Sequence, residues 1–231
     1  MGAIEAALQA VHGRIATACA QAGRDPLSVT LLAVSKTFPA GAIRAAWAAG
    51  QRAFGESYVQ EALAKQAELA ELPIEWHYIG ALQRNKTRAI AEHFAWVHSI
   101  DRADIAERLA RQRPPHLPQL QVCVQVNVGS EASKRGVAPQ EALPLARLVA
   151  ELPRLRLRGF MTIPPPSEDP QTQRSHFRVL AEVLREARHQ GLAVDCLSMG
   201  MSEDLEAAIA EGATIVRVGT AIFGARAPTA K

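Results

Sequence analysis

Eight short β-rich runs, each followed by a segment with helical periodicity, are the feature that most restricts the fold of this 231-residue chain. The runs begin roughly 20 to 40 residues apart, which is the length that a right-handed crossover through one helix needs between parallel strands. Apolar residues recur three and four positions apart between the runs, as at Phe177, Leu180 and Leu184. The expected strands cover residues 28–35, 51–57, 75–80, 96–101, 121–128, 155–163, 193–200 and 214–219.

Eight such units favour an α/β fold of the closed (β/α)8 TIM barrel type, with one extra helix before it over residues 2–22. An open doubly wound sheet is the alternative, because periodicity does not show closure. No linker divides the chain, so we expect a single domain over residues 1–231. The longest irregular piece, residues 164–173, predicts a mobile loop over one face of the barrel.

Composition restricts the location and the partners. The net charge is only +3 and the arginines form no basic block, so no nucleic-acid surface is expected. Cys19, Cys123 and Cys196 are far apart and odd in number, which argues against disulfides and against a zinc site and favours buried thiols in a reducing compartment. No 18-residue apolar span occurs. We expect a cytoplasmic protein that needs neither a metal nor a membrane.

Lys36 ends the first β-rich run, in the stretch LLAVSKTFPA. Lysine is scarce, at five of the 26 basic residues, so an amine at this point is unusual for the chain. Active groups of parallel α/β folds gather at the carboxyl ends of the strands, where Lys36 is expected. The alternative is a lysine whose stem packs on the rim while its ammonium reaches water.

The last two runs are followed by residues typical of a phosphate site. Ser198, Gly200 and Ser202 lie between the seventh run and a helix, with Ser202 as the expected N-cap, and Gly219 and Thr220 follow the eighth run. Loops after strands seven and eight are the usual phosphate cradle of this barrel, although the same residues also serve as turns and caps.

A phosphate and an amine at one mouth suit a phosphorylated aldehyde held as a Schiff base, and pyridoxal 5′-phosphate is the obvious one. Desolvation and the nearby Arg217 would lower the pKa of the Lys36 amine so that it condenses. Arg217 lies within a run of β-branched residues, where an ion pair with a carboxylate is the alternative to a ligand role. Facing the pyridine nitrogen, it would keep that nitrogen unprotonated and the ring a weak electron sink.

Ordered blocks over nearly the whole chain resemble the pyridoxal phosphate homeostasis protein family. They read LLAVSKTFP, FGESYVQEA, EWHYIGALQRNK, HSIDR, QVNVGSEASKRG, GFMTIPPP and SMGMSEDLEAAIAEGATIVRVGTAIFG. The resemblance implies a fold-type III barrel, similar to the N-terminal domain of alanine racemase, that binds pyridoxal 5′-phosphate for intracellular homeostasis of this vitamin B6 form. It implies that the cofactor is attached to Lys36, that the phosphate lies at Ser202, Gly219 and Thr220, and that Arg217 faces the ring nitrogen.

Some positions depart from the family or have weaker assignments. Ser57 stands where the family commonly has asparagine, which weakens one polar contact near the cofactor, and Ala81 stands where proline is frequent. Lys134 matches a second family lysine, with a solvated loop lysine as the alternative. His77 matches a family block as a cofactor-binding residue, with a core histidine as the alternative.

We interpret the chain as a non-catalytic carrier or regulator that holds pyridoxal 5′-phosphate (PLP) on Lys36 and supplies or buffers it. PLP-dependent apoenzymes are the candidate recipients, and the expected oligomeric state is a monomer. The alternative is a small amino-acid racemase, which needs a second acid or base on the opposite ring face. Tyr58 and Tyr78 lie in early segments, and few residues follow the eighth run, which speaks against the tyrosine base of fold-type III racemases.

Two further alternatives have less support. A Schiff-base aldolase usually holds its lysine on the sixth strand, and residues 155–163 contain none. A nucleic-acid module could use Arg154, Arg156 and Arg158, which alternate along one expected strand face, although the polar lower end of a barrel strand explains them as well.

Overall fold

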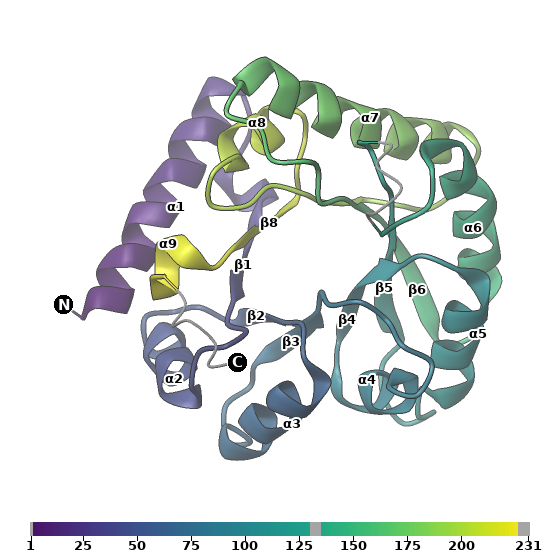
Figure 1. The fold of residues 1–231 in the computed structure, drawn as a ribbon, viewed down its shortest axis with the longest axis horizontal. Coiled ribbons are helices and arrows are strands. Elements are labelled where there is room, and N and C mark those ends of the chain that lie inside the picture. The colour runs from purple at the N-terminus through teal and green to yellow at the C-terminus, as the bar shows by residue number, and fades with distance from the viewer. Residues whose placement is uncertain (1, 130–134, 226–231) are drawn as a thin grey trace.

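The eight strands close into one parallel barrel in the order of the chain, as the computed structural model shows for residues 2–129 and 135–225 (Figure 1). The closure lies between β1 and β8, which pair from Thr30 with Ile215 to Ala33 with Val218. The closed barrel is therefore confirmed and the open sheet is wrong. The strands are β1 (Thr30–Val34), β2 (Ala53–Glu56), β3 (Glu75–Tyr78), β4 (Trp96–Ile100), β5 (Leu120–Gln125), β6 (Leu155–Met161), β7 (Cys196–Ser198) and β8 (Ile215–Val218).

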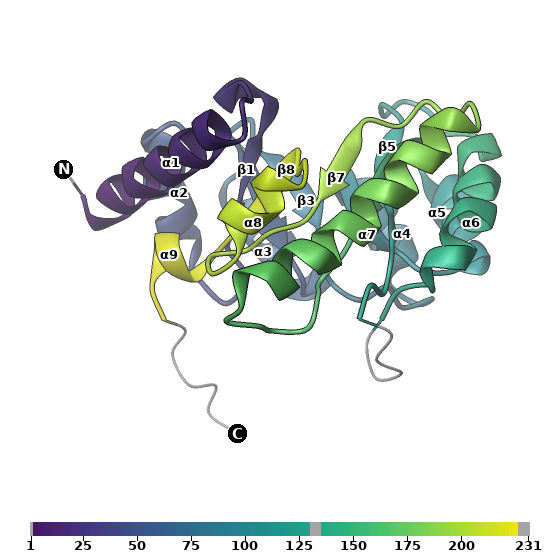
Figure 2. The ribbon, with the colours of Figure 1, turned by 90° about the horizontal axis from the view of Figure 1, so that it is seen from above.

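Helices surround this barrel. The expected extra helix is α1, which packs against α2, α8 and α9, and α8 lies between α1 and α7 (Figure 2). A short 3-10 turn over Pro26–Ser28 joins α1 to β1. The helices are α1 (Ala3–Gln21), α2 (Ala40–Ala48), α3 (Val59–Glu68), α4 (Thr87–His93), α5 (Ala103–Gln112), α6 (Pro139–Glu151), α7 (Pro170–His189), α8 (Leu205–Ala210) and α9 (Thr220–Phe223).

The apolar core has two parts. The larger part joins the outer faces of the strands to the inner faces of the helices, where Phe54, Phe160 and Phe177 are fully buried. The smaller part fills the inside of the barrel with one residue from each of seven strands. Its members are Leu32, Ala53, Trp96, Cys123, Met161, Cys196 and Ile215.

Two sequence-based expectations need correction. The seventh strand is only three residues long, because Asp195 and the residues before it form an irregular approach to the barrel. The piece expected to be irregular over residues 164–173 ends early, because α7 begins at Pro170. Asp169 caps that helix by accepting hydrogen bonds from the amides of Gln171 and Thr172 at 3.3 and 2.9 Å.

All three cysteines are buried thiols, as expected from the sequence. In the part of the chain that the structure describes, no helix has the length and apolar character needed to cross a membrane.

Candidate functional site

A cavity of about 260 Å³ opens at the carboxyl ends of β1, β7 and β8. Five of the residues that the sequence predicted for a cofactor site line it together. They are Lys36, Ser202, Arg217, Gly219 and Thr220. Because β1 pairs with β8, residues from opposite ends of the chain meet here. The other lining residues are Val34, Ile79, Ile163, Pro164, Pro166, Ser167, Gln173, Met201, Glu203 and Asp204.

The backbone just before Lys36 is held by a buried group of charges, the Glu56 cluster, which consists of Ser35, Glu56, Glu61 and Lys65. Ser35 donates from its hydroxyl to Oε1 of Glu56 at 2.6 Å. Lys65 Nζ donates to the Ser35 carbonyl at 2.9 Å, to Glu56 at 2.8 Å and to Glu61 at 2.5 Å. Burial raises the pKa of the Glu56 carboxyl, and the Lys65 ammonium acts in the opposite direction.

The residue after Lys36 is held by the same cluster. Thr37 has φ of 71°, a left-handed conformation that is rare for a β-branched residue, and its amide donates to Glu61 at 2.6 Å. Phe38 then packs on Phe223 of α9, with ring centroids 5.1 Å apart. The turn that carries the lysine is thus tied to α3 on one side and to α9 on the other.

The expected phosphate residues after β8 lie close to β1. A Cβ atom on Gly219 would come within 3.2 Å of the Val34 carbonyl oxygen, so glycine permits this approach of the two backbones. Thr220 begins α9, and the Ser202 hydroxyl accepts a weak 3.5 Å hydrogen bond from the amide of Ala221. Ser202 therefore faces the first turn of α9.

Ser202 is not the N-cap of the next helix, contrary to the sequence-based expectation. Asp204 takes that position in α8, and its carboxylate accepts a hydrogen bond from the Met201 amide at 2.5 Å. Arg14 of α1 holds the loop from outside by donating to the Ser202 carbonyl at 2.9 Å and to Glu206 at 2.7 Å.

Gly200 is buried below the cavity and does not line it. Its φ is 93°, and a Cβ there would come within 2.6 Å of the Cβ of Ala208. Its carbonyl accepts from the Arg217 amide at 2.9 Å. Its place in the site is structural: it lets the loop after β7 turn against α8.

Arg217 is 4% exposed and reaches the floor of the cavity. Nη1 donates to the carbonyl and the hydroxyl of Ser198 at 2.6 and 2.9 Å, and Nη2 donates to the Thr162 carbonyl at 2.8 Å. Burial lowers the pKa of Arg217 to about 10, so the guanidinium is still charged at neutral pH. The acceptors of these hydrogen bonds are neutral oxygens, whereas the alternative from the sequence was an ion pair between Arg217 and a carboxylate.

Ser198 and His77 belong to a hydrogen-bonded series inside the barrel, the axial chain, which consists of Arg217, Ser198, His98, His77 and Glu75. Neither Ser198 nor His77 lines the cavity, and they are 0% and 1% exposed. His77 stacks on Trp96 with ring centroids 5.2 Å apart. His77 therefore has the surroundings of a core histidine, the alternative given above, and it is connected to Arg217 through His98 and Ser198.

Ser57 lies beside a second cavity of about 530 Å³ on the β2 and β3 side. Lys36 and Ile79 line both cavities, whereas Ser57 lines only this one of the two. Lys86 and Tyr78 also line this second cavity. Lys134 lies outside the described residues.

The sequence did not single out His98, Glu56 or Lys65. His98 is fully buried, and its signals were its place in the block HSIDR and the alternation of inward and outward residues along β4. Glu56 and Lys65 are also buried, and the signal was a carboxylate at the end of an otherwise buried strand.

Only two of the three arginines around β6 share a face: Arg156 and Arg158 line one cavity at the amino-terminal rim of the barrel. Arg154 precedes the strand and donates to the Ala110 carbonyl of α5, whereas Arg158 packs over Trp96 at 4.8 Å and pairs with Asp195 at 2.7 Å. The expected row of three guanidiniums is therefore wrong.

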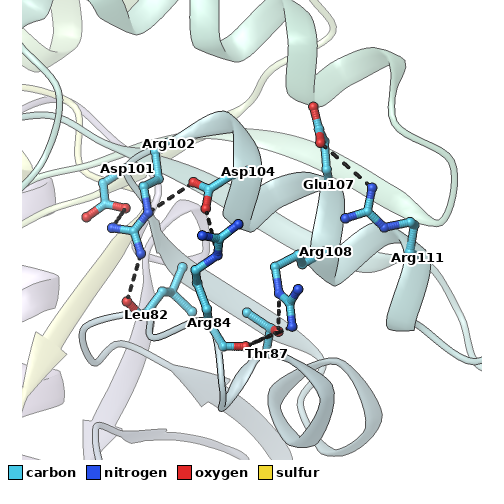
Figure 3. A network of polar contacts seen from close by, with 9 residues as sticks. All are labelled: Leu82, Arg84, Thr87, Asp101, Arg102, Asp104, Glu107, Arg108 and Arg111. Carbon is cyan, nitrogen blue, oxygen red and sulfur yellow. Dashed lines mark hydrogen bonds and ion pairs between the residues drawn. The ribbon is translucent and has the colours of Figure 1, made fainter.

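Arginines elsewhere on the surface also contact the protein itself. In Figure 3, Asp104 lies between two of them, 3.1 Å from Arg102 and 3.4 Å from Arg84, and Arg111 faces Glu107 on the same helix. Exposed pairs of this kind add little stability. They do supply carboxylate partners for guanidiniums on this side of the molecule.

Comparison with known proteins places the chain in a class. A sequence model of the family described as "Alanine racemase, N-terminal domain" matches residues 7–227. The alanine racemase of Corynebacterium glutamicum superposes with a TM-score of 0.66 at 20% identity, over 95% of this chain and 61% of that one, which shows the fold alone. The molecule is a fold-type III barrel of this class.

Closer relatives narrow the class. Pyridoxal phosphate homeostasis proteins of Pseudomonas aeruginosa and Escherichia coli are 59% and 52% identical to this chain, over 98% and 95% of it and 97% and 95% of their own lengths. The structure of PipY from Synechococcus elongatus with PLP bound has a TM-score of 0.80 at 42% identity, over 91% of this chain and all of that one. The chain belongs to the pyridoxal phosphate homeostasis protein family.

Proposed function

We propose that this protein binds pyridoxal 5′-phosphate in the 260 Å³ cavity, with Lys36 as the Schiff-base lysine, and supplies or buffers it in intracellular PLP homeostasis. The observation that carries the proposal is the convergence of Lys36 and Arg217 on one cavity with Ser202, Gly219 and Thr220. The name and the PLP-bound structure of the relatives support the choice of cofactor.

The described residues fit this group chemically. Ser202 and Thr220 offer hydroxyls, and Gly219 offers a backbone without a side chain of its own, at the edge where a phosphate would lie. The cavity volume of about 260 Å³ is just below the range of roughly 300 to 1,000 Å³ common for small-molecule sites, as suits a single substituted pyridine. Ser198, Gly200 and His77 are proposed as supports of this site rather than as contacts.

Arg217 is proposed to face the ring nitrogen. Its hydrogen bonds to Ser198 and Thr162 fix the guanidinium plane, and its positive charge opposes protonation of a neighbouring nitrogen. When bound, the cofactor supplies an electron sink, which is weak without that proton. This protein's residues therefore favour holding the cofactor over reacting it.

A non-catalytic role is part of the proposal. Among the described residues that line the cavity there is no histidine, tyrosine or cysteine, and Asp204 is engaged with the Met201 amide. A racemase needs an acid or base on each ring face. We propose a single domain over residues 1–231 that acts as a monomer in the cytoplasm, with apoenzymes as recipients.

The first test is covalent mapping. The protein is mixed with pyridoxal 5′-phosphate, and the visible spectrum is recorded before and after borohydride reduction. We expect a visible band that Lys36→Ala abolishes, and a reduced pyridoxyl group on the peptide containing Lys36. Lys86→Ala is the matched control, because Lys86 lines only the neighbouring cavity. A reduced group on another lysine, or no band, would contradict the proposal.

A second test separates carrier from racemase. The loaded protein is incubated with alanine in deuterium oxide, and exchange at Cα is followed by NMR. We expect no exchange beyond that of free pyridoxal 5′-phosphate at the same concentration. Faster exchange that requires Lys36 would favour the enzyme instead.

A further inference from the structure

We propose that Glu75, at the rim opposite to the cavity, positions Arg217 through a hydrogen-bonded series whose direction it dictates. The inference rests on the proposed function only where it assigns Arg217 to the cofactor. It concerns residues that the cofactor would not touch: Glu75, His77, His98 and Ser198.

The axial chain is continuous from one rim to the other. Glu75 Oε1 lies 2.7 Å from His77 Nε2, and His77 Nδ1 lies 2.9 Å from His98 Nε2. His98 Nδ1 lies 2.7 Å from the Ser198 hydroxyl, which accepts from Arg217 at 2.9 Å. Every separation is within ordinary hydrogen-bond length.

The Glu75 carboxylate determines which atom donates and which accepts in each hydrogen bond of the axial chain. An ionised carboxylate only accepts, so His77 Nε2 carries the hydrogen and, in a neutral ring, His77 Nδ1 must accept. His98 Nε2 then donates to it, and His98 Nδ1 accepts from the Ser198 hydroxyl. The Ser198 oxygen is left as an acceptor, which suits Arg217 because a guanidinium only donates.

The surroundings favour neutral imidazoles. Burial lowers the pKa of His77 and holds the pKa of His98 well below its usual range, where the charge of Arg217 adds to the effect. The other titratable groups around the axial chain are Arg158, which packs over Trp96, the thiols of Cys123 and Cys196, whose sulfur atoms lie 3.8 Å apart, and Asp204, whose charge acts on Arg217. Glu75 alone raises the pKa of His77.

The chain orients groups and does not conduct protons to the cavity. Because Arg217 has no site that accepts a proton, a proton entering at Glu75 stops below it. The axial chain transmits only the direction of its hydrogen bonds from Glu75 to Arg217. Ser198 presents its oxygen to Nη1, and the Thr162 carbonyl holds Nη2 at 2.8 Å.

The first experiment uses the protein without added cofactor. Long-range nitrogen–proton NMR of the histidine rings at pH 7.5 is expected to show the Nε2–H tautomer for both His77 and His98. Glu75→Lys replaces the acceptor by a donor, and both rings are expected to change to the Nδ1–H tautomer. Glu75→Gln keeps an acceptor oxygen and is expected to retain Nε2–H.

Glu92→Lys is the matched control, because Glu92 and Glu75 line one further cavity of about 540 Å³ and Glu92 does not belong to the axial chain. Glu75 is 51% exposed, so its replacement leaves the core unchanged. Unchanged tautomers in Glu75→Lys, or a charged ring in the native protein, would overturn the proposal.

The second experiment uses the loaded protein. Glu75→Lys is expected to weaken pyridoxal 5′-phosphate binding by about threefold to tenfold, because the Ser198 oxygen would then accept from both His98 Nδ1 and Arg217 Nη1 and hold Arg217 less firmly, and to move the pH midpoint of the visible band. Glu75→Gln should restore both, and Glu92→Lys should alter neither. If the tautomers change in Glu75→Lys while affinity and midpoint do not, the positioning role is overturned. Failure of the native protein to bind the cofactor would contradict the proposed function and leave the tautomer result standing.

Discussion

The Glu56 cluster and the axial chain both bring buried polar groups to the cavity, but they compensate burial in different ways. Lys65 and Glu56 are 7% and 0% exposed and neutralise each other in direct contact at 2.8 Å. The axial chain keeps its charges at its ends and places two neutral rings and a hydroxyl between them. The first arrangement holds the backbone around Lys36, and the second orients Arg217.

One site thus uses both opposite charges and directional hydrogen bonds. The contributions of the Glu56 cluster and the axial chain to stability should respond to pH in opposite directions. The pKa of Glu56 is raised on folding, so its contribution is greatest below about 4.5 and is lost as the pH rises through the folded value. The pKa values of His77 and His98 are lowered, so their contribution is complete above about 6.5 and is lost as the pH falls.

The largest effect is expected from Lys65→Met, which leaves the Glu56 carboxylate buried without its cation. We expect the free energy of unfolding to fall by about 3 to 5 kcal/mol, measured by urea denaturation at pH 7.5. The double variant Lys65→Met/Glu56→Gln should recover part of the loss, because the uncompensated charge is gone. Lys86→Met, on the rim, should change stability by no more than about 0.5 kcal/mol. A double variant no more stable than Lys65→Met would contradict this account of the cluster.

A smaller loss is expected from His98→Phe, which breaks the axial chain without introducing a charge. It leaves His77 Nδ1 and the Ser198 hydroxyl without the partner they share, at a cost of about 1 to 3 kcal/mol. His116→Phe, at an exposed position, is the control. If His98→Phe were as stable as the native protein in urea, the hydrogen bonds of the chain would contribute nothing.

The acid response should distinguish the two regions further. Between pH 7.5 and 5.5 the native protein should lose stability because His77 and His98 take up protons more readily when unfolded. The His98→Phe variant should lose about 1 kcal/mol less over the same range, since each unit of pKa difference corresponds to about 1.4 kcal/mol. Parallel curves of urea midpoint against pH would show that His98 does not titrate in this way.

The smallest effect is expected at Thr37, where the Glu56 cluster holds a left-handed backbone. Thr37→Gly relieves the steric cost and increases the freedom of the unfolded chain, so stability should change by less than about 1 kcal/mol. Thr37→Ala retains the Cβ and is the comparison. Calorimetry that showed Thr37→Ala to be clearly more stable than Thr37→Gly would mean that the conformation stores no strain.

The sequence predicted the barrel and the meeting of Lys36 with Gly219 and Thr220, because eight strand–helix units favour a closed barrel. Periodicity alone left the open sheet as an alternative, and only the pairing of β1 with β8 shows closure. It missed what depends on side chains meeting across the barrel. His77 and His98 lie on neighbouring strands, and nothing local indicates that both rings turn toward Ser198, 100 positions beyond His98. Ser202 looked like a helix cap because Asp204 and Ser202 are both good cap residues, and only the path of the loop decides between them.

The pairing of β1 with β8 also has a temporal consequence. Lys36 is made early during translation and Arg217 near its end, so a growing chain presents the amine long before the rest of the pocket exists. In a ribosome-bound fragment that lacks β8, Lys36 should therefore react with aldehydes at the same rate as any exposed lysine. Selective binding of the cofactor would begin only when β8 pairs with β1 and closes the barrel.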